Sequence, residues 1–402
     1  MNFATSTNEK GENRKAIIIG CGIAGPAMAL ALQRKGISSV IYESRKSFND
    51  AEGLFLGVSP NGLNVLKEFI LIENILTDYC PGRIVFYNSK NKRIGELDNR
   101  YQTERYGAEL VQVRRSLINS SIRNAAMAKG IEIHTGKKLS STNQTKNNVT
   151  AYFEDGSSAT ADFLIGCDGI HSAVRKSFLG NTPRITYTGL LSTGGFSTID
   201  NTKGMEDGIH MIFGERGFFA YAVSNRGEIW WFNNIARKQE PERNELTGIE
   251  KANLQKTLID LHRNDRPIIR KIIEASKTIE IYPIYDIPSL KTWYSGRICL
   301  IGDAAHATAP HIGQGASLAL EDTLVLANFL HKYYDVSNAF HQFQELRQSR
   351  VEKIVQQARK VGDTKTAPNK FQQFFRDLLL PIFLKSEAKK MDWVYSYKVS
   401  TD

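Results

Sequence analysis

The sequence predicts an α/β protein in which a mostly parallel sheet unit is interrupted along the chain by an antiparallel sheet and is followed by helices. Three observations lead to this prediction. A short apolar run near the amino terminus passes through a glycine-rich turn into a helical pattern, and a second run of this kind begins near residue 297. Between them, from about residue 185 to 285, aromatic and β-branched stretches alternate with turn residues, which is typical of antiparallel strands.

The composition is that of a globular protein. Of the 402 residues, 41% are hydrophobic and 23% are charged, and no apolar run reaches the roughly 18 residues that span a bilayer. The first 14 residues lack the apolar centre of a secretory signal, so we expect a flexible tail and a cytoplasmic location. The net charge of +10 is dispersed among acidic residues, which indicates a solvated basic surface rather than a nucleic-acid site.

Two classes of chemistry find no support in the sequence. The four cysteines form no CxxC pair and have no histidine-rich neighbours, so we expect neither a disulfide framework nor a metal site. The chain has no GxSxG elbow, and His306 and His311 have no evident serine or cysteine partner. Hydrolysis by a nucleophilic triad is therefore not predicted.

The amino-terminal unit has the pattern of a nucleotide-binding turn. Residues 15–20 (KAIIIG) are typical of a buried parallel strand, and the segment GCGIAG then places Gly20, Gly22 and Gly25 at GxGxxG spacing ahead of a helical stretch. The first glycine permits a tight turn, the second lets the backbone approach a pyrophosphate, and the third lets the helix pack on the strand. The pattern predicts a Rossmann-like dinucleotide-binding unit.

Glu43 completes this unit. It ends the next strand (residues 38–43, SSVIYE), at the distance from the glycines where an acidic residue binds two hydroxyls of an adenosine ribose. A solvated position at a strand end is the alternative interpretation. The unit alone does not distinguish FAD from NAD.

The second glycine-rich segment repeats this plan with different residues. A buried strand (297–302, RICLIG) is followed by Asp303, an irregular stretch, and residues 313–315 (GQG) ahead of an apolar helix. A ligand as large as FAD has a second half, so Asp303 would bind ribityl hydroxyls. The amides of 313–315 would meet the flavin ring, where a helix N-terminus stabilises negative charge. We therefore predict one ligand held by two distant segments.

A third motif lies between these two. The segment FLIGCDGIHSAVR contains Asp168, Gly169, Ser172 and Arg175 as DGxxSxVR. The three motifs, in this order and at these separations, resemble the FAD-dependent aromatic hydroxylases, the single-component flavoprotein monooxygenases of the para-hydroxybenzoate hydroxylase type. The resemblance extends from about residue 15 to 341.

The resemblance implies a set of cofactor-binding residues. They are Gly20, Gly22, Gly25, Glu43, Arg114, Asp168, Asp303, Gly313, Gln314 and Gly315. Arg114, in VRRSL, fits an arginine that contacts the cofactor in this family, although the adjacent Arg115 leaves the assignment open. Ser44 separates the ribose-binding acid from Arg45, whereas many members place a basic residue directly there, so the role of Arg45 is open.

In this family an antiparallel sheet roofs the substrate cavity above the flavin, and the hairpin predicted at GFFAYAV and EIWWF belongs to it. Candidates for the cavity lining are Met211, Phe213, Phe219, Tyr221, Trp231 and Pro310, with ordinary sheet core as the alternative for each. Candidates for a catalytic base are His210, Tyr221 and His311, and no residue identifies itself for that role.

The order of elements predicts a discontinuous cofactor domain. We assign residues 15–75, 106–184 and 286–341 to an FAD-binding domain, 76–105 and 185–285 to a substrate-binding domain, 342–402 to a C-terminal helical segment and 1–14 to the tail. The stretch FQQFFRDLLLPIFLK near the end is expected to be a helix that covers the two domains, with contact to a membrane surface as the alternative.

The resemblance implies a monooxygenase. NAD(P)H reduces FAD, O2 adds to give a flavin C4a-hydroperoxide, and the oxygen is delivered to an aromatic or polycyclic small molecule. Inactivation of an antibiotic such as a tetracycline or rifamycin, an epoxidase, or a reductase on the same fold are alternatives. A non-enzymatic nucleotide sensor is the alternative from another class, and the oligomeric state stays open.

Overall fold

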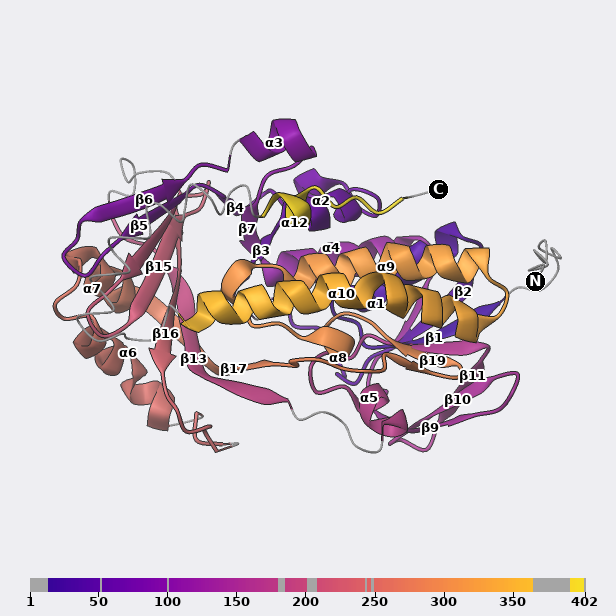
Figure 1. The fold of residues 1–402 in the computed structure, drawn as a ribbon. Coiled ribbons are helices and arrows are strands. Elements are labelled where there is room, and N and C mark those ends of the chain that lie inside the picture. Colours follow the sequence, from indigo (N-terminus) through magenta and orange to yellow (C-terminus); the bar gives the residue numbers. More distant parts are fainter. Residues whose placement is uncertain are drawn as a thin grey trace.

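The computed structural model describes residues 14–50, 53–99, 101–179, 185–200, 208–242, 244–246, 249–363 and 391–400. The elements form two sheet-centred regions joined by long helices (Figure 1). Apart from Arg14, the predicted tail lies outside the described residues, and so does the stretch FQQFFRDLLLPIFLK.

The first region is built on a six-stranded sheet with the order β18-β19-β12-β1-β2-β8. Its strands are β1 (Lys15–Ile19), β2 (Ser38–Tyr42), β8 (Glu132–His134), β12 (Phe163–Gly166), β18 (Tyr294–Ser295) and β19 (Ile298–Leu300). All pairs are parallel except β18 with β19. Because β19, β12 and β1 are neighbours, the turns that follow them meet at one edge of the sheet, and these turns carry the three sequence motifs.

Helices cover one side of this sheet, and a smaller sheet covers the other (Figure 1). The helices are α1 (Ala24–Arg34), α4 (Arg115–Ala128), α9 (Gly315–Lys332) and α10 (Val336–Asp363). The opposite layer consists of β9 (Leu139–Gln144), β10 (Val149–Phe153), β11 (Ser158–Ala161) and α5 (Ala173–Phe178). Helix α9 lies between α1 and α10 and is buried almost all round, as its apolar composition requires.

The second region is a seven-stranded, mostly antiparallel sheet with the order β17-β13-β16-β15-β14-β5-β6. Its strands are β5 (Ile84–Tyr87), β6 (Arg93–Leu97), β13 (Thr186–Ser197), β14 (Ile209–Phe213), β15 (Phe218–Val223), β16 (Ile229–Ala236) and β17 (Ser276–Asp286). Helices α6 (Ile249–Leu261) and α7 (Pro267–Glu274) pack on one face. These strands come from two separate stretches of chain, residues 84–97 and 186–286.

Short elements connect the two regions. A small sheet, β3-β7-β4, comprises β3 (Phe55–Val58), β7 (Val111–Arg114) and β4 (Tyr79–Pro81). The remaining helices are α2 (Pro60–Leu66), α3 (Tyr101–Tyr106), α8 (Asp303–His306) and α12 (Asp392–Tyr395), with 3-10 turns η1 (Ile72–Asn74) and η2 (Pro310–Ile312). Helix α10 runs beside α9 and extends towards the antiparallel sheet (Figure 1).

The mixed α/β fold, with its parallel sheet, antiparallel sheets and C-terminal helices, agrees with the class predicted from the sequence. No helix in the described part of the chain is long and apolar enough to cross a membrane. The four cysteines are free and buried, and burial raises the pKa of the Cys21 thiol to about 12. Among the described residues no cluster of His, Cys, Asp and Glu has the geometry of a metal site.

Candidate functional site

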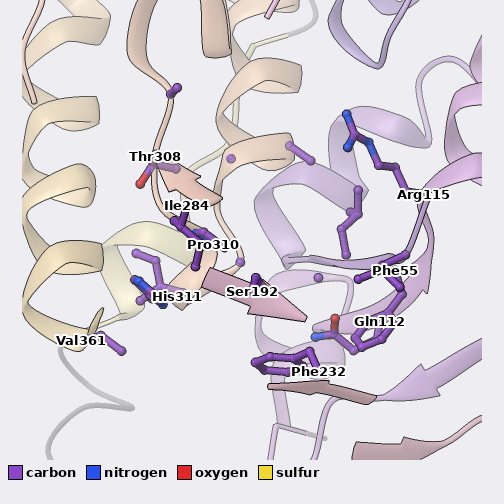
Figure 2. A pocket seen from close by; sticks show the side chains of 18 of the residues that line it. Phe55, Gln112, Arg115, Ser192, Phe232, Ile284, Thr308, Pro310, His311 and Val361 are labelled. Atoms are coloured by element: carbon purple, nitrogen blue, oxygen red, sulfur yellow. The ribbon is translucent and has the colours of Figure 1, made fainter. Parts of the chain in front are cut away.

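One cavity of about 2010 Å³ lies between the motif edge of the parallel sheet and the inner face of the antiparallel sheet (Figure 2). A site for one drug-sized ligand occupies roughly 300–1,000 Å³. The cavity therefore has room for two ligands, or for one very long one. Its walls come from the parallel-sheet turns, the antiparallel sheet, α10 and residues 391–395.

The three glycines of the first turn do different jobs. Gly20 has φ +103°, and a Cβ there would lie 2.5 Å from the Cys167 carbonyl oxygen. A Cβ on Gly25 would lie 1.9 Å from the Gly20 carbonyl oxygen, so this glycine lets α1 pack against the turn. Gly22 lines the cavity, and a Cβ there would have no heavy atom within 4 Å. The middle glycine therefore opens the backbone to a ligand.

The carboxylate of Glu43 organises this turn. It is 5% exposed, and its Oε2 accepts a hydrogen bond of 2.7 Å from the backbone N–H of Cys21. Its Oε1 accepts from the backbone N–H of Arg45 at 3.0 Å, while the Arg45 guanidinium lies 3.7 Å away. Glu43 is not part of the cavity lining.

Asp303 projects into the cavity from the turn after β19. Its side chain is accessible from the cavity but surrounded by protein, and this burial raises the pKa of the carboxyl group, against the opposing influence of His306 and Arg115. A buried carboxylate with accessible oxygens is a strong acceptor for hydroxyl groups of a bound ligand.

The amino end of α9 faces the same space. Gly313, in the left-handed region at φ +64°, ends the η2 turn, and Gly315 begins α9. Both line the cavity, so the positive dipole end of this 18-residue helix is directed at its contents. Gln314 is fully buried instead. It donates to the Ser59 hydroxyl at 2.7 Å and accepts from the Asn61 amide at 3.2 Å, which ties α9 to α2.

The antiparallel sheet contributes an apolar wall. On the strands β14, β15 and β16, Met211 pairs with Ala220, and Ala220 pairs with Phe232, so these residues share the face that looks into the cavity. Met211, Phe213, Trp230 and Phe232 line it.

A domain-family model described as an FAD binding domain matches residues 13–358. An FAD-dependent urate hydroxylase from Klebsiella pneumoniae subsp. pneumoniae is 30% identical, covering 87% of this chain and 90% of the relative. The chain belongs to the FAD-dependent aromatic hydroxylases. A 3-hydroxybenzoate 6-hydroxylase from Klebsiella oxytoca is 27% identical, covering 96% and 97%. The structure of Klebsiella pneumoniae HpxO complexed with FAD and uric acid superposes with a TM-score of 0.83 at 26% identity, covering 95% and 96%.

The hydroxylase is thus a flavoprotein oxidoreductase with FAD as its cofactor, as the sequence motifs predict. The described residues fit this group. Gly22 leaves open space at the first motif turn, Asp303 offers carboxylate oxygens that are accessible from the cavity, and the amino end of α9 faces the same cavity.

The two adjacent arginines of the hydroxylase take different positions. Arg114 forms ion pairs with Asp78, at 2.7 Å, and with Glu228, and its guanidinium stacks 4.1 Å from the Phe196 ring. It does not line the cavity, whereas Arg115 does. Figure 2 shows the Arg115 side chain at the edge of the cavity, away from Phe232 and Ser192. Arg114 is the last residue of β7 and Arg115 is the first residue of α4, so the chain changes direction between the two side chains.

The DG motif lies close to the cavity without all of its side chains entering it. Asp168 accepts hydrogen bonds from the backbone N–H groups of Ala173, at 2.7 Å, and Val174, at 3.1 Å, and caps the start of α5. Its Oδ1 is buried without a partner, and burial raises the pKa of its carboxyl group. Arg175 donates to the Ala304 carbonyl at 2.7 Å and so joins the DG motif to α8.

Two of the predicted lining residues lie on the face of the sheet opposite the cavity. Phe219 and Trp231 stack on each other at 5.3 Å and pack beneath α6 and α7, so they do not line the cavity. The reason is the strand period of two, since Trp230 and Phe232 take the inward positions on β16. Met211, Phe213, Tyr221 and Pro310 do line the cavity.

The three base candidates also separate. His210 is 3% exposed, stacks between Tyr87 and Tyr221, and does not line the cavity. Tyr221 reaches the cavity lining, but it packs with Phe219 and Trp231 on the other face of the sheet, and its ring stacks on that of His210 at a centroid distance of 4.7 Å. His311 lines the cavity beside Gly362 of α10 (Figure 2).

The sequence did not predict a cluster of buried charged residues that joins α8, α9 and α10 of the hydroxylase. It consists of His306, Glu321, Asp322, Arg347 and Arg350. Arg347 bonds Glu321 at 2.6 Å and Asp322 at 2.8 Å, and all three are fully buried. The available signal was the ED pair at 321–322 inside an otherwise apolar helix, because buried acids require partners.

Proposed function

We propose that this flavoprotein uses NAD(P)H and O2 to hydroxylate an aromatic or polycyclic small molecule held against the antiparallel sheet. The observation that carries the proposal is the single continuous cavity, which joins the motif turns to an apolar, aromatic wall. Bound FAD supplies the redox chemistry that activates oxygen. The chain's own residues supply binding, orientation and exclusion of water.

Each proposed cofactor contact has a local reason. Gly22 lets the backbone approach the pyrophosphate, and Asp303 accepts from ribityl hydroxyls. The amino end of α9, at Gly313 and Gly315, stabilises negative charge on the ring system. Arg115, rather than Arg114, is the arginine placed to contact the cofactor, because Arg115 lines the cavity.

In our proposal, a second group of residues supports this site by fixing the conformation of the turns that carry the contact residues. These are Gly20, Gly25, Glu43, Asp168 and Gln314. Glu43 accepts a hydrogen bond from the Cys21 backbone, Asp168 accepts one from the first residue of α5, and Gln314 donates to Ser59, the residue before α2. Glu43 is proposed to exchange part of its bonding for ribose hydroxyls when the nucleotide binds.

Substrate activation is assigned to the wall opposite these turns. Phe232, Trp230 and Met211 exclude bulk water and hold an aromatic ring by dispersion and stacking. His311 is the best placed of the proposed proton acceptors, since His210 does not line the cavity and the Tyr221 ring stacks on His210.

A cytoplasmic location is part of the same proposal. It is supported by the four free, buried thiols, which suit a reducing compartment, and by the nicotinamide nucleotide that the reaction consumes.

The test is a purification followed by a substrate screen. We expect a yellow protein with a flavin absorption spectrum. We also expect a compound among urate, hydroxybenzoates, hydroxynicotinate, polycyclic phenols, a tetracycline and a rifamycin to stimulate NADH or NADPH oxidation and to gain one oxygen by mass spectrometry. Hydrogen peroxide is measured alongside to detect unproductive turnover. A protein that stays colourless after FAD is supplied would refute the proposal.

A further inference from the structure

The sheet end of the cavity carries three neutral polar side chains in an apolar surround. Aromatic and aliphatic residues, among them Phe86, Ile209, Met211, Trp230 and Phe232, make up most of this wall. Apart from the tyrosines and Glu280 of β17, the polar exceptions are Gln112 on β7, Ser192 on β13 and Asn234 on β16. Polar groups placed singly in an apolar pocket fix the orientation and identity of a ligand.

Ser192 and Asn234 lie directly opposite each other on neighbouring antiparallel strands and share the cavity face. They are 4% and 3% exposed. The Oδ1 atom of Asn234 is buried and has no hydrogen-bond partner. Leaving a buried acceptor unpaired is costly, and folded proteins rarely do so. Because this acceptor belongs to a cavity residue, a ligand that donates a hydrogen bond would satisfy it.

The preceding residue provides an internal comparison. Asn233 points to the other face of the same strand, where its amide donates to the Phe218 carbonyl at 2.8 Å and contacts the His262 ring nitrogen at 2.7 Å. Its carbonyl accepts from the Thr193 hydroxyl at 3.3 Å. The fold thus supplies partners for the asparagine that serves structure, and supplies none for Asn234 Oδ1.

Gln112 approaches the pair from the other side of the cavity. Its carboxamide lies beside Gly57, and Figure 2 shows it directed towards Phe232 and Ser192. A carboxamide both donates and accepts hydrogen bonds. This group can therefore donate to a hydroxyl oxygen or accept a hydrogen bond from an O–H or a ring N–H.

The charges of the residues that line this end of the cavity disfavour an anionic ligand. On the antiparallel sheet, the only charged residue among the described lining residues is Glu280, which is acidic. The lysine and arginine residues of the lining are on other elements, with Arg115 on α4 and Lys353 and Lys360 on α10, whose C-terminal end extends towards the sheet. A carboxylate buried against the sheet itself would lose its hydration and find no cation among the described lining residues of that sheet.

We propose that Asn234, Ser192 and Gln112 determine specificity by selecting an uncharged aromatic substrate that donates an O–H or N–H hydrogen bond, and by rejecting arenecarboxylates. This inference rests on the proposed function, since it concerns the substrate end of that same cavity. Asn234 Oδ1 accepts the donated hydrogen bond, Ser192 and Gln112 complete the contacts, and the aromatic wall holds the ring.

The test compares three probes of one shape on the FAD-loaded protein at neutral pH: 2-naphthol, its methyl ether and 2-naphthoate. Dissociation constants are measured by calorimetry and by perturbation of the flavin spectrum. Loss of one buried neutral hydrogen bond corresponds to roughly fivefold to tenfold in affinity. We therefore expect 2-naphthol to bind about tenfold more tightly than the ether. We expect its affinity to exceed that of naphthoate by at least the same factor.

The variants separate recognition from folding. Asn234→Leu and the smaller Asn234→Ala should reduce the preference for naphthol over the ether to within about twofold and leave the affinity for the ether unchanged. Ser192→Ala should weaken naphthol binding alone. The matched control is Ser197→Ala, on the opposite face of β13, where the hydroxyl bonds the Ile272 carbonyl at 2.8 Å. That variant should be less stable and keep the full preference.

The inference is overturned if naphthoate binds as tightly as naphthol, if the ether does, if none of the three binds, or if the preference survives in both Asn234 variants. If the protein binds FAD and arenecarboxylates stimulate its oxidation of NAD(P)H, this inference is refuted and the proposed function stands. A protein that binds no FAD would instead refute the proposed function.

Discussion

At the residue scale, the carboxyl group of Asp303, a proposed FAD contact, lowers the stability of the ligand-free protein. Enclosure by protein raises the pKa of its carboxyl group above the ordinary value. For an acid whose folded-state pKa is raised, stability falls as pH rises from the unfolded pKa of about 3.9 through the folded pKa, and the penalty is then constant. The ionised group is therefore unfavourable until a ligand engages it.

Asp303→Asn is predicted to make the flavin-free protein more stable than the wild type at pH 7, with the difference disappearing below about pH 4. The same change should weaken FAD binding by roughly tenfold to a hundredfold, since a hydrogen bond to a charged group is lost. Thermal unfolding of flavin-free protein from pH 4 to 8 and titration with FAD test both statements. A variant less stable than wild type at pH 7 would contradict the first.

The glycines of the first turn allow a sharper comparison. Gly25→Ala places a Cβ 1.9 Å from a carbonyl oxygen and should destabilise the fold by at least about 1–3 kcal/mol. Gly22→Ala meets no atom within 4 Å, so the flavin-free protein should unfold within about 0.5 kcal/mol of wild type. Its FAD affinity should nevertheless fall about tenfold or more, because the Cβ occupies the approach to the pyrophosphate. Equal FAD affinity in Gly22→Ala and wild type would count against the assigned role.

The residues that line the cavity were predictable where a motif turn positions them. They were not predictable where the answer depends on which face of a strand a side chain occupies. Asp303 and Gly22 follow buried strands in recognisable turns, and both line the cavity. The proposed lining mixed Met211 with Phe219 and Trp231, although the ladder places Met211 on one face and the other two on the opposite face. Residues 218–223 and 229–232 of that hairpin are all apolar or aromatic, so this part of the sequence has no alternation from which the inward face can be predicted.

At the element scale, the packing of α9 against α10 depends on charges that had to be buried together. Burial alone would raise the pKa of Asp322, but His306 and Arg347 outweigh it and hold the pKa of this carboxyl group below its ordinary value. The carboxylate also accepts from the Gly302 backbone N–H at 2.9 Å. The cluster thereby connects both helices to the turn that carries Asp303.

Arg347→Met should destabilise the protein by about 3–5 kcal/mol at pH 7, because it leaves Glu321 and Asp322 buried without this cation.

For an acid with a depressed folded pKa, the stabilisation is complete above the unfolded pKa and is lost as pH falls through the folded pKa. The difference in unfolding free energy between wild type and Asp322→Asn should thus be constant above about pH 5 and narrow below about pH 4. Denaturant unfolding at several pH values measures it, and a difference that does not narrow in acid would contradict the pKa assignment.

The elements themselves were largely predictable, because apolar runs bounded by glycine mark β1, β12 and β19, and these strands prove to be neighbours. The charge cluster was not, since Arg347 and Asp322 are 25 residues apart on different helices. Pairing across such a distance depends on how helices pack, and no local pattern in either helix specifies it.

At the scale of the whole molecule, the cavity is closed on one side by the last described segment. Met391, Trp393 and Tyr395 line it. Arg350 of α10 fixes this segment by donating to the Trp393 carbonyl at 2.9 Å and the Val394 carbonyl at 2.8 Å, and its guanidinium lies 4.0 Å from the Tyr397 ring. The same side chain pairs with Glu321 of the buried cluster.

Arg350→Gln is accordingly predicted to loosen residues 391–400 while the parallel sheet keeps its protection, because Glu321 retains its ion pair with Arg347. Hydrogen exchange measured by mass spectrometry should show faster exchange in 391–400 alone, and a ligand bound at the sheet end should dissociate several-fold faster since one wall of its cavity has become mobile. The control is Arg270→Gln, which removes an exposed pair with Glu274 on α7 and should change neither quantity. Unchanged exchange of 391–400 in Arg350→Gln would show that other contacts, such as the Tyr106 hydroxyl bonding Asp392 at 2.6 Å, suffice to hold the segment against the cavity.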